Sequence, residues 1–261
     1  MMLKIFDFGS NWAEFSKRRV DPGRLEIACE SLRSLVGKNN FLGKSFLDVG
    51  CGSGLFSIAA HRLGATKVVG IDVNPHCVEI SKTNCDLLAA GARIEFHVAS
   101  ALEAEQLKRF GNFDLVYAWG SLHHTGSMWK AIGNVSERVA PEGILILAIY
   151  NKHVTSPAWK TIKWAYNHVP DFVQRFMILI FAGIIYVAKF LVTRTNPLKK
   201  ERGMDFWYDV IDWVGGYPYE YATPSEVEAI VTIGGFQLSR FAPSSVPTGC
   251  NEFVFEKNSH H

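Results

Sequence analysis

The sequence lacks the features that mark secreted, zinc-binding and nucleic-acid-binding proteins. Its five cysteines, Cys29, Cys51, Cys77, Cys85 and Cys250, form no CxxC pair, which argues against a disulfide framework and a zinc site. The first twelve residues lack the apolar core of a signal peptide, and a formal net charge of +2 gives no broad basic footprint. We therefore expect a cytoplasmic protein with no metal and no nucleic-acid partner.

The chain also lacks an uncharged apolar run of the roughly 20 residues that a transmembrane helix needs. Phe176–Ala188 is uncharged over only 13 residues before Lys189 interrupts it. A single crossing here would also separate the last strands from the sheet that they should complete. We predict a buried or amphipathic helix without a membrane span, and peripheral membrane contact stays open as the alternative.

What the chain does have is a long alternation of strand and helix patterns. It has 261 residues, 48% of them hydrophobic and 20% charged, which suits one large domain with an insertion. Strand-like runs are Phe46–Val49, Lys67–Ile71, Arg93–Val98, Phe113–Ala118 and Ile144–Tyr150. Helix-like runs between them are Leu55–Leu63, Pro75–Ala90, Ala101–Arg109 and Ser127–Val139. This order predicts a doubly wound α/β fold with a parallel sheet and right-handed crossovers.

The remaining segments define the predicted domain organisation. Residues 1–44 read as an N-terminal helical segment with a start signal at Asp21-Pro22, and 45–150 as the core. Residues 151–216 form an aromatic helical cap after the fifth strand. Residues 217–257 add a helix over Thr223–Ile233 and two strands, Phe236–Phe241 and Glu252–Phe255. We expect a Rossmann-like, seven-stranded, mostly parallel sheet with an antiparallel edge strand and a turn at residues 141–143.

The stretch FLDVGCGSG, residues 46–54, predicts a ligand-binding loop between a buried strand and a helix. A dinucleotide fingerprint needs a third glycine at position 55, where the chain has Leu55. Asp48 before the loop repels a pyrophosphate but suits an ammonium group. Asp72, at the end of the second strand, can accept hydrogen bonds from both hydroxyls of a ribose. A nucleoside with an amino-acid tail satisfies both carboxylates.

Four motifs in order resemble those of the class I S-adenosylmethionine-dependent methyltransferases. They are FLDVGCGSG, VVGIDVNP, FDLVYAWGSLHHT and VAPEGILILAIYN, and they cover residues 46–151. The resemblance implies S-adenosyl-L-methionine as cofactor and S-adenosyl-L-homocysteine as product. It implies that the cofactor-binding residues are Asp48, Gly50, Cys51, Gly52, Gly54, Asp72, Val73, Asn74, Ser100, Ala101 and Trp119. Ser100 stands where many relatives carry Asp, and Phe8 and Trp12 either fold over the cofactor or pack in a local core.

The acceptor side is predicted at the ends of the fourth and fifth strands. His124 and His123 are candidates for a general base or a substrate contact, with loop orientation by hydrogen bonding as the alternative. Adjacent histidines without an acidic or cysteine partner in register do not predict a metal site. Tyr150 and Asn151, and from the cap Arg202 and Tyr208, are the candidate substrate-binding residues. Asp205, Asp209 and Asp212 either point into a polar pocket or form the solvated face of a helix, and we favour the solvated face for Asp205.

These observations favour methylation of a small or carrier-linked, partly apolar acceptor. We expect O-methylation by in-line transfer, because the aromatic cap suits a bulky acceptor such as a quinone precursor. Two alternatives stay open at this point. One is methylation of RNA or protein, and the other is a non-catalytic regulatory module that binds S-adenosylmethionine. The sequence predicts neither the oligomeric state nor the identity of the acceptor.

Overall fold

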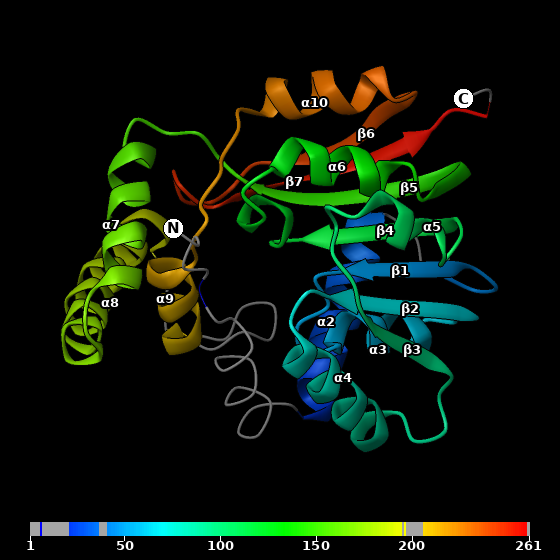
Figure 1. The fold of residues 1–261 in the computed structure, drawn as a ribbon, viewed down its shortest axis with the longest axis horizontal. Coiled ribbons are helices and arrows are strands. Elements are labelled where there is room, and N and C mark those ends of the chain that lie inside the picture. Colours follow the sequence, from blue (N-terminus) through cyan, green and yellow to red (C-terminus); the bar gives the residue numbers. More distant parts are fainter. Residues whose placement is uncertain (1–5, 7–20, 37–40, 195, 197–205, 260–261) are drawn as a thin grey trace.

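The structure is a computed structural model that describes residues 6, 21–36, 41–194, 196 and 206–259, with backbone only at 189, 192, 193, 208 and 209. Seven strands form one sheet in the order β3-β2-β1-β4-β5-β7-β6 (Figure 1). The strands are β1 (Ser45–Val49), β2 (Lys67–Asp72), β3 (Ile94–Val98), β4 (Phe113–Trp119), β5 (Val139–Tyr150), β6 (Phe236–Ala242) and β7 (Cys250–Lys257). The first five are parallel, and β7 runs antiparallel to both β5 and β6. The predicted fold class is confirmed.

Helices cover both faces of this sheet because the strand side chains alternate between two apolar cores. Phe46, Val68 and Ile146 join one core, whereas their neighbours Leu47 and Val69 join the other. The helices that cover the first core are α2 (Pro22–Val36), α3 (Leu55–Arg62) and α4 (Pro75–Leu88). The helices that cover the second core are α5 (Ala104–Lys108), α6 (Met128–Ser136) and α10 (Pro224–Ile233).

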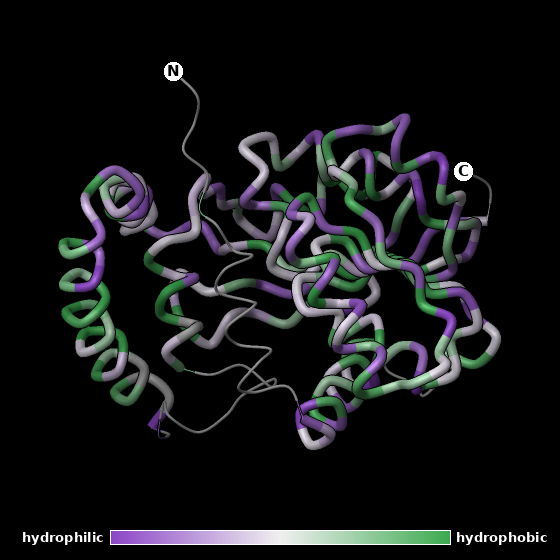
Figure 2. The backbone as a smooth tube through the Cα atoms, turned by 60° about the horizontal axis from the view of Figure 1, so that its bottom comes forward, coloured by the Kyte–Doolittle hydropathy of each residue, from purple (hydrophilic) through white to green (hydrophobic). Residues whose placement is uncertain are grey.

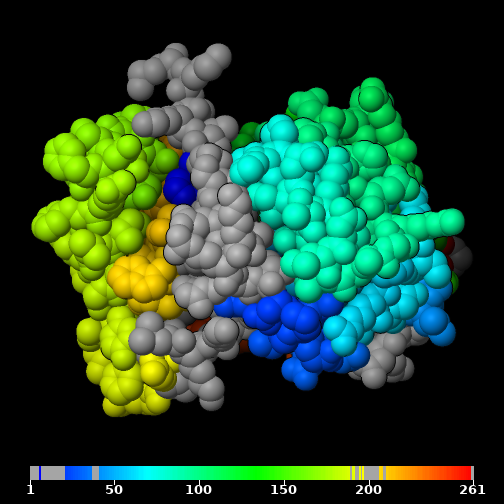
Figure 3. All heavy atoms as spheres, turned by 90° about the horizontal axis from the view of Figure 1, so that it is seen from below, coloured from blue at the N-terminus to red at the C-terminus, as the bar shows by residue number. Residues whose placement is uncertain are grey.

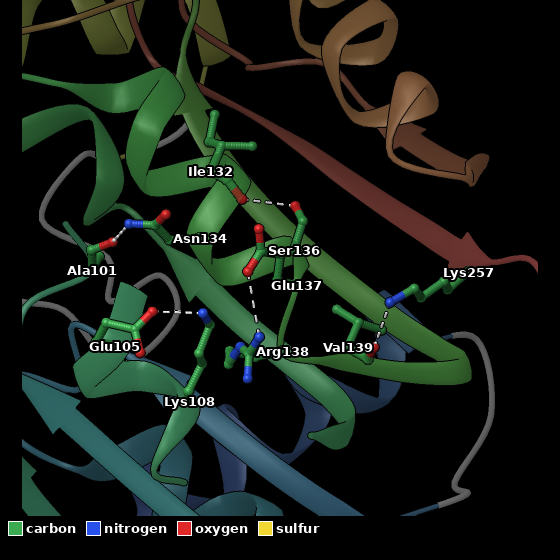
Figure 4. Close-up of polar contacts among 10 residues, drawn as sticks. All are labelled: Ala101, Glu105, Lys108, Ile132, Asn134, Ser136, Glu137, Arg138, Val139 and Lys257. Atoms are coloured by element: carbon green, nitrogen blue, oxygen red, sulfur yellow. Dashed lines mark hydrogen bonds and ion pairs between the residues drawn. The ribbon is translucent and has the colours of Figure 1, made fainter. Parts of the chain in front are cut away.

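Side chains tie these helices and strands to neighbouring carbonyl groups (Figure 4). On α6, Asn134 Nδ2 donates to the carbonyl of Ala101, 2.9 Å away, and so fixes the loop after β3. On β7, Lys257 Nζ donates to the carbonyl of Val139 at 2.8 Å. Both bonds join segments far apart in the sequence, the first at the end of β3 and the second at the start of β5.

The turn predicted at residues 141–143 lies inside β5 instead of before it. Val139 pairs with Phe113 and Ile144 pairs with Leu115. The residues of β5 between them therefore bulge out of register with β4. Glu142 takes a positive φ of 61°, and a Cβ on Gly143 would lie 2.8 Å from the Ala140 carbonyl oxygen. The turn chemistry was therefore read correctly, but pairing on both sides extends the strand through it.

The helix starts predicted from local signals are present in the structure. Thr223 caps α10 by accepting from the Glu226 amide, while the Glu226 carboxylate accepts from the Thr223 amide at 2.7 Å. At α2, the Arg24 amide donates to Asp21 Oδ1 at 3.0 Å. Local capping fixes these helix starts, so they can be predicted from the sequence without tertiary information.

Three helices between β5 and α10 form a layer beside the sheet. They are α7 (Ser156–His168), α8 (Asp171–Thr193) and α9 (Phe206–Gly215). Tyr166 of α7, Ala182 and Ile185 of α8, and Val210 and Val214 of α9 form a small core of their own. Figure 1 shows α8 at the edge of the molecule furthest from the sheet. We call α7, α8 and α9 the cap.

Helix α8 is longer and more exposed than the helix predicted from the sequence. The prediction began near Phe176, whereas α8 begins at Asp171. Only 17% of the window Asp171–Ala188 is buried, so the helix is not the buried one that we considered. Among the described residues, α8 alone is long and apolar enough to cross a membrane by length and composition. Its packing against α7 and α9 leaves one face to solvent.

Candidate active site

The glycine loop lies at the carboxyl end of β1, where it turns into α3. The amides of Gly50 and Cys51 both donate to the Ile71 carbonyl, at 2.8 and 3.0 Å, which joins the loop to β2. Gly54 caps α3 with a φ of 74°, a conformation that favours glycine. The loop is therefore held by main-chain bonds at the switch point of an open α/β sheet, the usual ligand site of such folds.

Gly50 also brings the loop against the chain that follows β4. Its φ is 77°, and a Cβ there would overlap the side chain of Ser121. Ser121 Oγ in turn donates to the Val49 carbonyl at 2.7 Å. The fit of Ser121 onto Gly50 brings the segment after β4 to the rim of the loop. The position of Ser121 could not be predicted from the sequence.

Asp72 joins the glycine loop to the start of α4. Its two carboxylate oxygens accept from the Gly52 amide at 3.0 Å and from the Asn74 amide at 2.9 Å. Burial raises the pKa of Asp72, and the amide bonds from Asn74 and Gly52 oppose that rise. The carboxylate thus sits beside the loop, half-buried, at the place that the sequence predicts for a ribose-binding group.

Asp48 lies beneath the loop rather than on its surface. It is 2% exposed, and Ser57 Oγ of α3 donates to its Oδ2 at 2.7 Å. Burial raises the pKa of Asp48 to about 7, helped by the charge of Asp72 and opposed by the Ser57 hydrogen bond. Its charge would therefore be felt by an ammonium group above the loop, and such a cation would favour the ionised form.

The residues predicted beside the adenine follow β2 and β3. Val73 is 69% exposed, whereas the side chain of Asn74 caps α4 by accepting from the His76 amide at 2.9 Å. Ser100 Oγ accepts from the Leu102 amide, and the Ser100 amide donates to Gln106. Because these polar groups shape their own turns, Val73 is the side chain best placed to cover an apolar ring.

Two further cofactor-site candidates point into the protein. The Cys51 side chain is buried and its Sγ lies 3.6 Å from Ser81 Oγ, with a pKa raised well above its ordinary value by burial. The Trp119 indole N–H donates to Glu252 of β7 at 3.1 Å. A cofactor would therefore meet the main chain of these two residues, or the part of the Trp119 ring away from its N–H group.

An aromatic cluster lies at the ends of β4 and β5, where the sequence predicts the acceptor side. The 3₁₀ turn η1 (Leu122–His124) brings the His123 ring to 4.1 Å from the Tyr150 ring, centroid to centroid. The His124 ring lies 5.6 Å from the Tyr150 ring, and the Tyr219 ring lies 5.0 Å from the Tyr150 ring. His123, His124 and Tyr150 are thus brought together as the sequence predicted.

A buried lysine joins this cluster from the cap. Lys163 of α7 is fully buried, with Nζ 5.5 Å from the Tyr150 ring centroid and 4.8 Å from that of Tyr219. Its Nζ also donates to the carbonyl of Trp213 on α9. The amine thereby connects the cap to the sheet through two tyrosine faces and one carbonyl.

Electrostatics keep the histidines neutral at physiological pH. Burial, together with the charge of Lys163, lowers the pKa of His124 to about 3, and burial, His124 and Lys163 lower that of His123 well below 6.5. Burial lowers the pKa of Lys163 to about 7. His124 Nδ1 lies 2.7 Å from the Pro218 carbonyl oxygen, which can only accept, so the proton resides on Nδ1. The Nε2 atom therefore carries the lone pair.

The other substrate-binding candidates are placed differently or lie outside the described residues. Asn151 serves the loop between β6 and β7: its Nδ2 donates to the Pro247 carbonyl at 2.8 Å and its Oδ1 accepts from Asn251. Arg202 lies outside the described residues, as do Phe8 and Trp12. Tyr208 lies on α9, and its side chain is outside the description. Of the two candidates whose side chains are described, Tyr150 lies in the cluster and Asn151 does not.

Sequence reasoning missed Ser57, Ser121, Lys163, Gly216 and Tyr219. The segment GGYPYEY carries a local signal, since glycine pairs and prolines indicate a fixed backbone. A Cβ on Gly216 would lie 2.7 Å from His124 Cε1, and Glu220 accepts from the Met128 amide at the start of α6. Nothing in the sequence around Lys163 distinguishes it from a solvated lysine. Among the described residues, no three His, Cys, Asp or Glu side chains are grouped to hold a metal.

A Rossmann-like sheet with a glycine loop after β1, a carboxylate at the end of β2 and an aromatic cluster after β4 and β5 is the arrangement typical of nucleoside-binding α/β proteins. A family model described as a methyltransferase domain matches residues 21–179, more than half of the chain. The chain belongs to this family, the class I S-adenosylmethionine-dependent methyltransferases.

Known proteins similar to the chain differ in what they methylate. A ubiquinone biosynthesis O-methyltransferase of Azorhizobium caulinodans is 28% identical over 77% of this chain and 61% of its own length. A ribosomal protein L11 methyltransferase of Tolumonas auensis is 35% identical over 41% of this chain and 34% of its own length. The chain thus spans less than two thirds of each. The magnesium protoporphyrin IX methyltransferase of Synechocystis PCC 6803, solved with bound SAH, shares the fold with a TM-score of 0.59 at 16% identity, over 95% of this chain and 94% of its own.

Proposed function

We propose that this protein transfers a methyl group from S-adenosyl-L-methionine to a hydroxyl of a small or carrier-linked, partly apolar acceptor. The observation that carries the proposal is a pair of sites at one edge of the sheet. Asp72 and the glycine loop form a nucleoside cradle at β1 and β2, and His124, Tyr150 and Lys163 form an aromatic, cationic wall beyond β4 and β5. One end fits the donor and the other fits an acceptor.

The residues at the donor end fit S-adenosylmethionine. Asp72 would hold the ribose, Val73 would cover the adenine, and the main chain from Gly50 to Gly54 would hold the methionine part. Asp48 beneath the loop would attract its ammonium group. The bound cofactor supplies an activated methyl group on a sulfonium, so the protein's task is to align the acceptor and exclude water.

The acceptor end suits a hydroxyl that ionises readily. His124 carries its lone pair on Nε2 but has a pKa of about 3, so it is a weak base for an aliphatic alcohol. Lys163, with a pKa of about 7, can place a positive charge near a phenolate or enolate oxygen. We infer that His124 orients the acceptor and receives a proton only from an acidic hydroxyl, while Lys163 stabilises the anion.

Calorimetric titration with S-adenosylhomocysteine tests the donor end. The wild-type protein should bind it, and Asp72→Ala should weaken binding by at least about 100-fold, because the ribose hydroxyls lose the carboxylate that accepts their hydrogen bonds. Asp86→Ala, an exposed carboxylate on α4, is the matched control and should bind normally. Undiminished binding by Asp72→Ala would overturn the assignment of the site.

Turnover is tested by S-adenosylhomocysteine release with three separate acceptor pools: small metabolites, total RNA and total protein. Methylation confined to the metabolite pool, read as the mass of one added methyl group, is the expected result. Release with RNA or protein alone would overturn the acceptor class, and binding without release in any pool would indicate a regulatory module. His124→Asn should lower turnover while leaving cofactor affinity unchanged.

A further inference from the structure

Helix α8 exposes a continuous apolar face along its whole length. Eight side chains on this face are between 45% and 74% exposed: Phe172, Phe176, Leu179, Ile180, Ile184, Val187, Phe190 and Leu191. Their spacing of mostly three or four residues places them on one side of a helix. We call this set the α8 face. Figure 2 shows the same helix as a largely apolar tube at the edge of the molecule.

The opposite side of α8 is occupied by the rest of the cap. Ala182 and Ile185 are each 4% exposed and pack with Tyr166 of α7 and with Val210 and Val214 of α9. This packing fixes the rotation of the helix and directs the α8 face outward. In the space-filling view, α7 and α8 form one flank of the molecule in yellow-green (Figure 3).

The size of the α8 face sets it apart from ordinary surface apolar residues. A 23-residue helix is about 34 Å long at 1.5 Å per residue, and apolar side chains follow it from end to end. Single exposed apolar side chains are common, but soluble monomers rarely leave a contiguous stripe of this length in water. We therefore expect the α8 face to be covered by a partner that is apolar over a similar length.

Charge selects a lipid surface as that partner. Segment 151–216 holds nine Lys or Arg, one of them the buried Lys163, and five Asp or Glu, whereas the rest of the chain holds 18 and 20. From Arg175 to Arg194 the sequence contains no acidic residue, and both arginines are exposed. Trp164 and Trp207, 46% and 47% exposed, add ring edges of the kind found at membrane interfaces. Two copies facing each other would bring like charges together.

We propose that the α8 face docks the protein onto an anionic membrane, with the helix lying in the plane of the interface. The apolar side chains would enter the boundary between headgroups and acyl chains, and the basic side chains would lie among anionic headgroups. A crossing is excluded because α8 packs against α7 and α9, and the chain returns to pair β7 with β5. The docking is independent of the proposed methyl transfer.

Vesicle flotation of the intact protein tests this docking without any methyl acceptor. We expect the protein to float with vesicles of phosphatidylcholine and phosphatidylglycerol, and to float less with phosphatidylcholine alone or at high salt. The double variant L179E/I184E, in the middle of the α8 face, should reduce the bound-to-free ratio at least about tenfold. Carbonate washing should release the protein, whereas a spanning helix would stay.

The matched control is Leu87→Glu, because Leu87 is 70% exposed on α4, a helix outside the cap. It should float like the wild type. Thermal midpoints and S-adenosylhomocysteine binding of both variants should equal those of the wild type, which separates lost docking from lost folding or a failed cofactor site. Wild-type protein that stays unbound with anionic vesicles would overturn the proposal. So would a wild-type dimer that L179E/I184E converts to a monomer while vesicle binding is unchanged.

Discussion

The proposed donor end and the proposed acceptor end of the site are built in different ways. At the donor end, main-chain bonds and the Asp72 carboxylate, all within residues 48–74, join two neighbouring strands and one loop. At the acceptor end, His124 meets Pro218 across 94 positions, and Lys163 meets Trp213 across 50. The donor end thus rests mainly on one contiguous segment, with Ser121 added from the chain after β4, whereas the acceptor end exists only when the cap and the sheet have packed together.

Both ends bury a group that burial drives toward its neutral form. Asp48 is an acid with a raised pKa and Lys163 is a base with a lowered pKa, each about 7. The neutral form of Asp48 has gained a proton, whereas the neutral form of Lys163 has lost one. The two groups therefore change the free energy of unfolding in opposite directions as pH rises. This contrast gives a way to measure the two ends separately.

The largest expected effect belongs to the acceptor end. The unfolded chain holds the Lys163 proton up to pH 10.5 and the folded chain only to about 7, so the free energy of unfolding rises with pH across that window. Lys163→Met removes the buried charge, and we expect it to raise the free energy of unfolding at pH 7 by about 4 kcal/mol, after losing one hydrogen bond. Urea denaturation at pH 7 and pH 10 measures this, with exposed Lys160→Met as control. A destabilised Lys163→Met at pH 7 would show that the amine is a favourable buried cation.

The next effect, at the donor end, has the opposite pH dependence. Folded Asp48 keeps its proton to about pH 7 and the unfolded chain only to 3.8, so the free energy of unfolding falls as pH rises between these values. Asp48→Asn keeps an acceptor for Ser57 and should raise the free energy of unfolding at pH 8 by about 3 kcal/mol. The same variant should bind S-adenosylmethionine more weakly. Equal free energies of unfolding of the wild type and Asp48→Asn at pH 8 would mean that the Asp48 carboxylate is not destabilised by burial.

A smaller effect tests the close approach within the donor end. Gly50→Ala forces a side chain to a φ of 77° and against Ser121, and should lower the free energy of unfolding by about 2 kcal/mol. The variant Ser121→Gly removes the overlap, so a double-mutant cycle should show a coupling of about 1 kcal/mol. Strictly additive effects would show that the segment after β4 does not rest on the loop.

The smallest expected effect on stability separates the two ends by function. Gly216→Ala places a Cβ 2.7 Å from His124 Cε1 and from the Asp212 carbonyl, so it should cost about 1 kcal/mol and displace His124. Turnover should fall about tenfold while cofactor affinity stays unchanged. Gly183→Ala on α8, where nothing lies within 4 Å, is the control and should not lower stability or turnover. Weaker cofactor binding by Gly216→Ala would mean that the two ends are coupled.

The parts of the fold that the sequence predicts are those set by neighbouring residues. The sequence predicts the helix caps at Asp21 and Thr223, the five core strands and the glycine loop. Capping and strand periodicity depend on residues only a few positions apart. The turn at 141–143 became part of β5 because β4 pairs with β5 on both sides of it. Asn151 was expected at the substrate, but its side chain bonds to Pro247 and Asn251, which lie about a hundred positions away.

By itself, the sequence determined the donor end: FLDVGCGSG and VVGIDVNP specify a loop and two carboxylates through local backbone requirements. Only the tertiary structure decided that Asp48 lies beneath the loop against Ser57, and that Lys163 is a buried amine over two tyrosine rings. It also decided which side of α8 faces solvent, since packing of Ala182 and Ile185 sets the helix rotation. Burial depends on which distant segments come together, so the ionisation of these groups and the exposed α8 face arise only in the folded chain.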